Sequence, residues 1–287
     1  MRTALPYYKP GKFIQMPAKI DRAFYDIGHL DTLAEADTPL HRLDPRAKLL
    51  TTAVFIISVV SFGKYEIVRL LPFFLYPAVL IGLGDLPLGF LLRKLLIVSP
   101  FVIFVGIFNP WLDRTVLLQL GALDITGGWL SFISLLLRFI LTVSAAFVLI
   151  ASTGFTTICM ALEKLGTPKI FAVQLLLLYR YLFILIGEAI RMTRAQSLRS
   201  FSRKSHINFR VFLQMLGNLL LRTIDRAQRI HMAMLSRAFT GEIQIIRQFR
   251  FGYQEVLFLT GFTGLFIILR ATDAVDLLGR LVLEIGR

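Results

Sequence analysis

Hydrophobic residues gather in runs long enough to cross a membrane, and most charged residues lie between these runs. A membrane-spanning helix needs about 20 mainly apolar residues. The pattern therefore predicts five transmembrane helices. The first run is short, so we expect its helix to begin before Leu49 and its basic residues to extend towards the interface. The runs cover residues 49–62, 67–83, 95–108, 129–150 and 253–269.

Composition agrees with this pattern. The chain is 56% hydrophobic and 17% charged, with a mean hydropathy of +0.69. These values predict an all-α integral membrane protein, with about five transmembrane helices plus long cytoplasmic helices. The first 40 residues are polar and lack the apolar core of a secretory signal, so we expect a cytoplasmic lead-in.

The distribution of charge predicts the orientation. Arg42, Arg46 and Lys48 crowd the start of the first run, and cytoplasmic loops are enriched in such residues. Asp44 suits the cap position of that helix and Pro45 its first turn. The loop at residues 84–94 is basic and is expected inside. The loop at residues 109–128 has no basic excess and is expected outside, with an interfacial segment at residues 116–120.

A basic arm, Arg191–Arg250, dominates the net charge of +14. The arm holds twelve basic residues and two acids, an excess of +10. The apolar run 170–187 before it is long enough to span, but Arg180 interrupts it and a span there would place the arm outside. We therefore predict one long helix over residues 170–201 lying against the bundle, and a second over residues 208–237. The basic residues are Arg191, Arg194, Arg199, Arg203, Lys204, Arg210, Arg222, Arg226, Arg229, Arg237, Arg247 and Arg250.

These boundaries predict four regions. Residues 1–40 form the lead-in, and residues 41–151 form the first four transmembrane helices. Residues 152–250 form a cytoplasmic domain of long amphipathic helices, which begins with a short helix ended by Gly166 and Pro168. Residues 251–287 form the last span and tail.

The two arm helices end alike. The first arm end (residues 197–201) is Ser-Leu-Arg-Ser-Phe, and the second arm end (residues 235–239) is Leu-Ser-Arg-Ala-Phe. Each places an arginine, Arg199 or Arg237, among small or apolar residues where the helical pattern stops. From the residues alone, each arginine either satisfies the last carbonyls of its own helix or inserts into a partner protein.

Arg138 lies inside the fourth apolar run. An arginine at the bilayer centre costs about 2.5–3.5 kcal/mol, so it must face the bundle interior, a water-filled path or a partner. A structural role, bonded to carbonyls within the bundle, and a role in coupling both stay open.

Motifs for catalysis and metal binding are absent from the sequence. It contains no phosphate-binding loop and no metalloprotease or hydrolase motif, so we predict neither an enzyme nor a bound cofactor. The lone Cys159 excludes an internal disulfide. His29 and His41 match no ligand spacing and are interpreted as solvated loop residues, so no metal site is predicted. The basic excess lies between apolar runs, which favours topology over nucleic-acid binding.

Several motifs, in this order, resemble one family of membrane transport subunits. Residues 43–50, LDPRAKLL, resemble the opening motif of the transmembrane subunit of energy-coupling factor transporters. Residues 179–183, YRYLF, and 188–192, EAIRM, resemble its cobalt/nickel branch, the CbiQ type. Residues 195–200, AQSLRS, and 233–241, AMLSRAFTG, are similar to the two coupling motifs. Two positions depart from them: Leu198 replaces the usual alanine, and Ala238 replaces the common glycine.

The resemblance implies a mechanism and a set of partners. Arg199 and Arg237 would each insert into a groove on one of two cytoplasmic ABC ATPases (CbiO-like). Closure of the ATPases would then move the arm ends and act on a separate membrane capture subunit (CbiM-like, with or without a small CbiN-like subunit), which binds the metal. The expected location is the inner membrane of a prokaryotic cell, in contact with lipid and not with nucleic acid. Residues flanking the two arginines are Leu198, Ser200, Ser236 and Ala238; supporting residues are Asp44, Pro45, Arg46, Arg138, Arg180, Glu188 and Gly241.

Other interpretations stay open at this point. A coupling subunit shared among vitamin-capture proteins would carry the same arm. A membrane scaffold would use the arm to bind acidic proteins or lipids without ATP. A stand-alone transporter would need polar groups at the midplane and an internal repeat, and apart from Arg138 the sequence offers neither.

Overall fold

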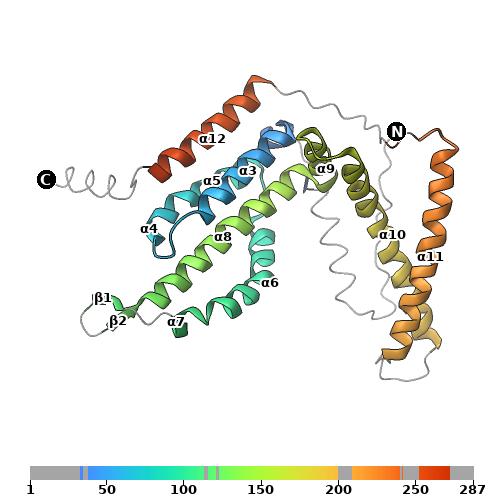
Figure 1. Cartoon of the computed structure of the whole chain (residues 1–287), viewed down its shortest axis with the longest axis horizontal. Coiled ribbons are helices and arrows are strands. Elements are labelled where there is room, and N and C mark those ends of the chain that lie inside the picture. Colours follow the sequence, from blue (N-terminus) through green and yellow to red (C-terminus); the bar gives the residue numbers. More distant parts are fainter. Residues whose placement is uncertain are drawn as a thin grey trace. The chain divides into compact units, whose positions relative to one another are not determined.

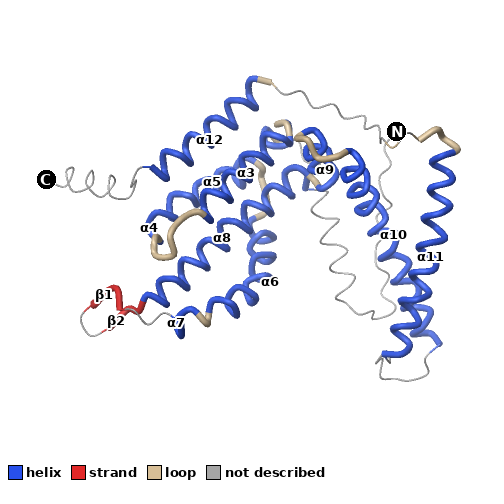
Figure 2. Tube along the Cα trace, in the orientation of Figure 1, coloured by secondary structure: helices blue, strands red, loops and turns tan. Residues whose placement is uncertain are grey.

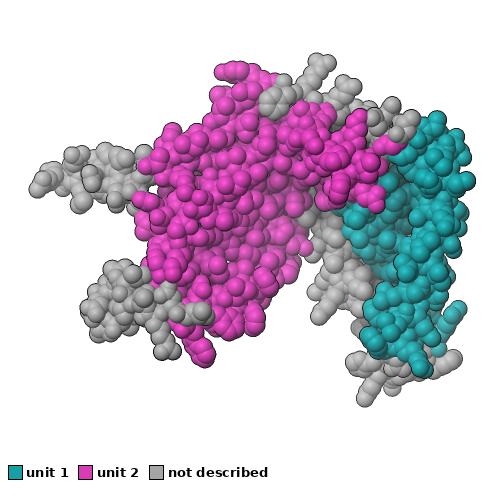
Figure 3. All heavy atoms as spheres, in the orientation of Figure 1, with its two compact units in different colours: residues 1–29, 177–240 teal, residues 30–176, 241–287 magenta. Residues whose placement is uncertain are grey.

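The structure is a computed structural model that describes residues 33–34, 38–112, 116–120, 123–199, 209–239, 241 and 252–271. These residues fall into two compact units (Figure 3). Unit 1 contains residues 177–240, and unit 2 contains residues 30–176 and 241–287. The boundary at Leu177 lies inside one continuous helix.

Helices make up nearly all of the described chain, as the all-α prediction requires (Figures 1 and 2). A two-stranded hairpin is the exception. The elements are α2 (Pro39–Arg42), α3 (Pro45–Val60), α4 (Ile67–Leu70), η1 (Leu71–Phe74), α5 (Leu75–Leu83), α6 (Leu88–Gly106), α7 (Asn109–Leu112), β1 (Val116–Leu120), β2 (Leu123–Thr126), α8 (Gly127–Thr153), α9 (Phe155–Lys164), α10 (Lys169–Arg199), α11 (Phe209–Leu235) and α12 (Tyr253–Ala271).

Four stretches of the described chain are long and apolar enough to cross a membrane: Leu88–Trp111, Gly127–Thr153, Lys169–Arg199 and Tyr253–Ala271. Three contain predicted spans. The remaining stretch, Lys169–Arg199 (α10), is the run that we predicted to lie outside the membrane because of its charge. Its position relative to the membrane stays a prediction. The other two predicted spans lie on shorter helical segments, α3 and Ile67–Leu83.

Helix α3 begins as its sequence predicts. Asp44 caps it by accepting a hydrogen bond from the Arg46 amide at 2.9 Å, and Pro45 occupies the first turn. The helix thus starts four residues before Leu49, as expected. Pro45 fits because the first turn leaves its amides without helical partners, and proline has no amide hydrogen.

The core of unit 2 is an aromatic cluster shared by α3, η1, α5 and α12. The ring of Phe55 on α3 lies 4.6 Å from Tyr76, 5.4 Å from Phe266 and 6.0 Å from Phe73, and all four side chains are almost fully buried. Thr52 and the Tyr76 hydroxyl share a hydrogen bond of 2.9 Å. Such offset and edge-to-face pairs add about 0.5–1.5 kcal/mol each beyond burial, so this cluster holds α12 on α3.

Two sequence predictions need correction, and a third is given a secondary structure. The basic loop predicted at residues 84–94 is mostly helix, because α6 already starts at Leu88 behind Pro87. The predicted helix over 67–83 tightens into the 3₁₀ segment η1 around Pro72, whose ring excludes the usual amide bond. The segment at 116–120 forms strand β1, paired antiparallel with β2 through Val116–Thr126 and Leu120–Leu123, and its interfacial position stays a prediction.

Close approach of α6 to α8 depends on Gly106. A Cβ at this position would lie 2.6 Å from the Phe132 ring and 3.1 Å from Leu135. We expect Gly106→Ala to destabilise the protein by about 1–3 kcal/mol through overpacking. Thermal unfolding of the purified protein in detergent would measure this. Gly89→Ala on the same helix is the control, since a Cβ there meets nothing within 4 Å; equal stability of both variants would contradict the packing argument.

Unit 1 holds most of the long helices of the arm. Residue 177 onwards of α10 and all of α11 belong to it. The prediction of one continuous first arm helix is confirmed, since α10 runs from Lys169 to Arg199. The short helix before it is confirmed as α9, and Gly166, with φ 110°, follows it.

Candidate coupling site

An ion cluster joins the two arm helices within unit 1. Glu188 on α10 accepts hydrogen bonds from Arg191, one turn later at 2.7 Å, and from Arg222 on α11 at 2.5 Å. Its side chain is only 16% exposed, against 67% for Arg191 and 62% for Arg222. Charge-assisted bonds of this kind are stronger than neutral ones, so this cluster helps to hold α11 against α10.

The second arm end has a specific backbone geometry. The Phe239 amide bonds to the Met234 carbonyl at 3.1 Å, and the Ala238 amide bonds to the Leu235 carbonyl at 3.0 Å. This pair of bonds is a Schellman motif, and it places Ala238 in the left-handed region with φ 55°. Glycine is favoured at such a position, which explains in physical terms why the similar motifs carry glycine there.

Arg237 is consequently exposed at the tip of α11. Backbone amides and the Ser236 hydroxyl, which donates to the Met232 carbonyl at 2.9 Å, use the last carbonyls of the helix. Within the described residues the Arg237 guanidinium makes no hydrogen bond or ion pair. The carbonyl-capping role considered for this arginine is therefore absent from the described chain.

The first arm end is similar up to the last described residue. Arg199 is the final residue of α10 and is exposed, next to Leu198, which is 73% exposed. The Ser197 hydroxyl donates to the Arg194 carbonyl at 2.8 Å, so it bonds within its own helix as Ser236 does. Arg199 has no hydrogen bond or ion pair with any described residue; Ser200 lies outside the described residues.

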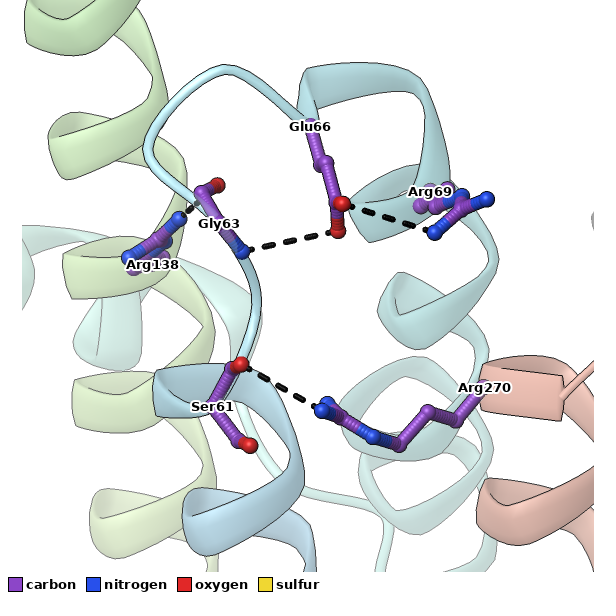
Figure 4. Close-up of polar contacts among 6 residues, drawn as sticks. All are labelled: Ser61, Gly63, Glu66, Arg69, Arg138 and Arg270. Carbon is purple, nitrogen blue, oxygen red and sulfur yellow. Dashed lines mark hydrogen bonds and ion pairs between the residues drawn. The ribbon is translucent and has the colours of Figure 1, made fainter.

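Arg138 contacts the backbone of a loop (Figure 4). Its guanidinium, from α8, donates to the Gly63 carbonyl in the turn after α3. Arg270 on α12 reaches the Ser61 carbonyl at 3.4 Å, and Glu66 accepts from Arg69 at 3.4 Å and from the Gly63 amide. The structural alternative for Arg138 thus has a defined partner, while a role in coupling stays a prediction.

The opening motif leads into a buried polar junction in unit 2. Asp44 is 2% exposed and Lys48 is 4% exposed, and the Lys48 ammonium donates to the Ser152 carbonyl at the end of α8, at 3.0 Å. The expectation that the basic residues extend to the interface is therefore wrong for Lys48. Arg46 lies 3.9 Å from Asp44. Sequence reasoning missed this junction because its two halves are 104 residues apart.

The remaining sequence candidates occupy exposed positions. Arg180 is exposed on α10 and makes no hydrogen bond or ion pair with the described residues. Gly241 is exposed, with φ 92°, a conformation that favours glycine. Neither position has a described contact that tests its role.

Groups of three or more His, Cys, Asp or Glu able to hold a metal do not occur among the described residues. His41 is not the solvated loop residue that we expected. It lies in α2, is 6% exposed and hydrogen-bonds through Nδ1 with Thr38 at 2.6 Å. His29 lies outside the described residues.

Comparison with known families decides the identity. The family model described as CbiQ, cobalt transport protein, matches residues 36–246, which include both arm ends and the buried junction. The chain belongs to the CbiQ family. This CbiQ-family chain is a membrane-embedded transmembrane subunit of the energy-coupling factor type.

Several relatives carry names that agree with this family. The transmembrane protein EcfT of Ruminiclostridium cellulolyticum is 28% identical over 79% of this CbiQ-family chain and 90% of its own length. EcfT of Streptococcus thermophilus is 30% identical over 71% of this chain and 82% of its own. A putative fused cobalt transport protein, CbiMQ, of Methanocorpusculum labreanum is 33% identical over 31% of this chain and 15% of its own.

Proposed function

We propose that this CbiQ-family chain couples two cytoplasmic ABC ATPases to a separate capture subunit in an importer for cobalt or nickel ions. Arg199 and Arg237 each insert into one ATPase. The observation that carries this proposal is the pair of exposed guanidiniums, each at the end of a long helix and each without a partner among the described residues. A guanidinium is always charged and has a planar set of donors, so it suits a groove lined with carboxylates or carbonyls.

The surface of α11 supports a role in binding partners. No residue of this 27-residue helix is buried, and many of its large apolar side chains are exposed. Phe209, Phe212, Leu216 and Leu220 follow the three- and four-residue spacing that places them on one face. A face of this kind requires a lipid surface or another protein chain to cover it.

Charge supports a cytoplasmic position for the arm. Its excess of +10 fits the positive-inside tendency, and it also attracts an acidic ATPase surface. The fused relative named CbiMQ supports a CbiM-like capture subunit as the membrane partner. Cobalt as cargo is supported by that name and by the description of the family.

A second candidate is a coupling subunit shared among several vitamin-capture proteins. The two relatives named EcfT favour it, because they match more of this chain than the fused cobalt protein does. The two candidates share the arm and the ATPases and differ in the number and kind of capture proteins.

Affinity purification of the chain from its native membranes, followed by mass spectrometry, tests the proposal. We expect an ABC ATPase together with one small membrane protein rich in potential metal ligands. An ATPase together with several different capture proteins would favour the shared subunit. Recovery of the intact chain in mild detergent without any ATPase would overturn both candidates and favour a membrane scaffold.

A further inference from the structure

The buried junction between α3, α8 and α9 has no role in the proposal so far. It lies wholly in unit 2, where α9 packs against α3. Lys48 and Ser152 are 4% and 3% exposed, and their hydrogen bond of 3.0 Å joins the first turn of α3 to the last turn of α8. Thr52, one turn further along α3, is 2% exposed and bonds to the Lys48 carbonyl at 2.8 Å.

The Lys48 contact stabilises the end of α8 for an electrostatic reason. The carboxyl end of a helix carries partial negative charge, and its last carbonyls lack helical partners. An ammonium group buried there satisfies one carbonyl and lies at the favourable end of the helix dipole. Removal of the ammonium would leave the Ser152 carbonyl buried without this donor, which costs about 1–3 kcal/mol.

Directly beside this contact lies a single break in the helical path. Gly154 separates α8 from α9 with φ 76° and ψ 146°, a conformation that other residues rarely adopt. Its amide bonds back to the Ile150 carbonyl at 2.9 Å, and its carbonyl accepts from the Ile158 amide at 3.1 Å. The helical path is therefore interrupted at one residue, and Lys48 is bonded two residues before it.

We propose that Lys48 is a positioning residue for energy coupling, which holds the bend at Gly154 against α3. Chain order places α9 between this bend and α10, the helix that ends at Arg199. A movement that arrives from α10 through the turn at Gly166 into α9 is then passed to α3 and its aromatic core. Without the Lys48 bond, rotation at Gly154 absorbs the movement. This inference rests on the proposed function.

The test uses the complete complex in liposomes, with Lys48→Met as the main variant, because methionine keeps the length of the side chain and removes the ammonium. We expect ATPase assembly and hydrolysis to persist and cobalt(II) uptake per ATP hydrolysed to fall at least about tenfold. Lys48→Arg, which can still donate to the carbonyl, should restore uptake. Gly154→Ala, which strains the bend with Lys48 intact, should also lower uptake per ATP.

Thr51→Val is the matched control. Thr51 is also fully buried in the first turns of α3, but its hydroxyl donates at 2.7 Å to the Ala47 carbonyl of the same helix. Its replacement removes a buried polar group without breaking a contact to α8. We expect uptake per ATP at the wild-type level.

Cys159 supplies a readout that needs no cargo. It is the chain's single cysteine, lies on α9 and is 1% exposed. Alkylation should be slow with and without ATP in the wild type, and should accelerate with ATP in Lys48→Met as α9 separates from α3. Absence of any ATPase from the wild-type complex would count against the proposed function. Loss of support at the Gly154 bend would instead appear only in Lys48→Met and Gly154→Ala.

Several results would overturn the inference. Wild-type uptake per ATP in assembled Lys48→Met or Gly154→Ala would show that the bend needs no support. An equal loss in Thr51→Val would indicate a general packing defect. If neither Lys48→Met nor Gly154→Ala assembled with the ATPases, the Lys48 contact would serve folding alone.

Discussion

The double variant Arg199→Glu with Arg237→Glu should lose its ATPases completely while still inserting into the membrane. If the proposal holds, each reversal places a carboxylate where the ATPase groove receives a guanidinium that is exposed and has no partner among the described residues. Loss of a buried charge partner at an interface costs about 2–5 kcal/mol, so each site alone should weaken binding about 30-fold or more. Co-purification with the ATPase, and the ATPase-to-subunit ratio by mass spectrometry, measure the effect.

A matched control separates these two positions from the charge of the arm as a whole. Arg226→Glu with Arg229→Glu changes the net charge equally, at two positions on α11 that lie at least eight residues before Arg237 and outside both arm ends. We expect this variant to keep its ATPases. If both double variants lose them alike, the arm acts by bulk charge, as a scaffold would, and the insertion of two arginines is wrong.

Charge reversal at Glu188 should have the second largest effect. Glu188→Arg places a cation next to Arg191 and Arg222, so the attraction that joins α10 to α11 becomes a repulsion. Because both arginines are largely exposed, we expect a loss of about 1–2 kcal/mol. Pulsed electron paramagnetic resonance between spin labels at Ala195 and Gln214 should show a broader distance distribution, and ATPase binding should weaken.

The charge swap Glu188→Arg with Arg222→Glu provides the decisive control. It restores opposite charges across the two helices, so the narrow distance distribution and the ATPase binding should both return. A swap that leaves both readouts as poor as the single variant would mean that Glu188 acts through something other than its pairing with Arg222.

Local signals were sufficient for much of the fold. Asp44 and Pro45 predict the start of α3, and Gly166 with Pro168 predicts the end of α9. Both predictions succeed because helix caps and breaks depend on residues only a few positions apart. The apolar run before Arg191 likewise predicts the continuous helix α10. The hairpin β1–β2 was missed because its strands are short and lie between two apolar runs.

The sites depend on contacts that a sequence pattern does not contain. Lys48 looks like an interfacial lysine until α8 places the Ser152 carbonyl beside it, and Glu188 meets Arg222 only after the chain has reversed direction. Alanine favours a continuing helix, so the left-handed conformation of Ala238 follows from the Schellman bonds around it and not from its own preference. The two arm ends could be recognised from their sequence motifs, whereas the exposure of both arginines was seen only in the structure.

The uncovered surface of α11 has a consequence for how the cell must produce this protein. A helix with large apolar side chains exposed along its whole length is a target for proteases and chaperones until another surface covers it. Synthesis of the chain in excess of its partners would therefore be wasteful, and its steady-state level should follow theirs. The amount of the chain would then depend on its partners through the exposed face of one helix.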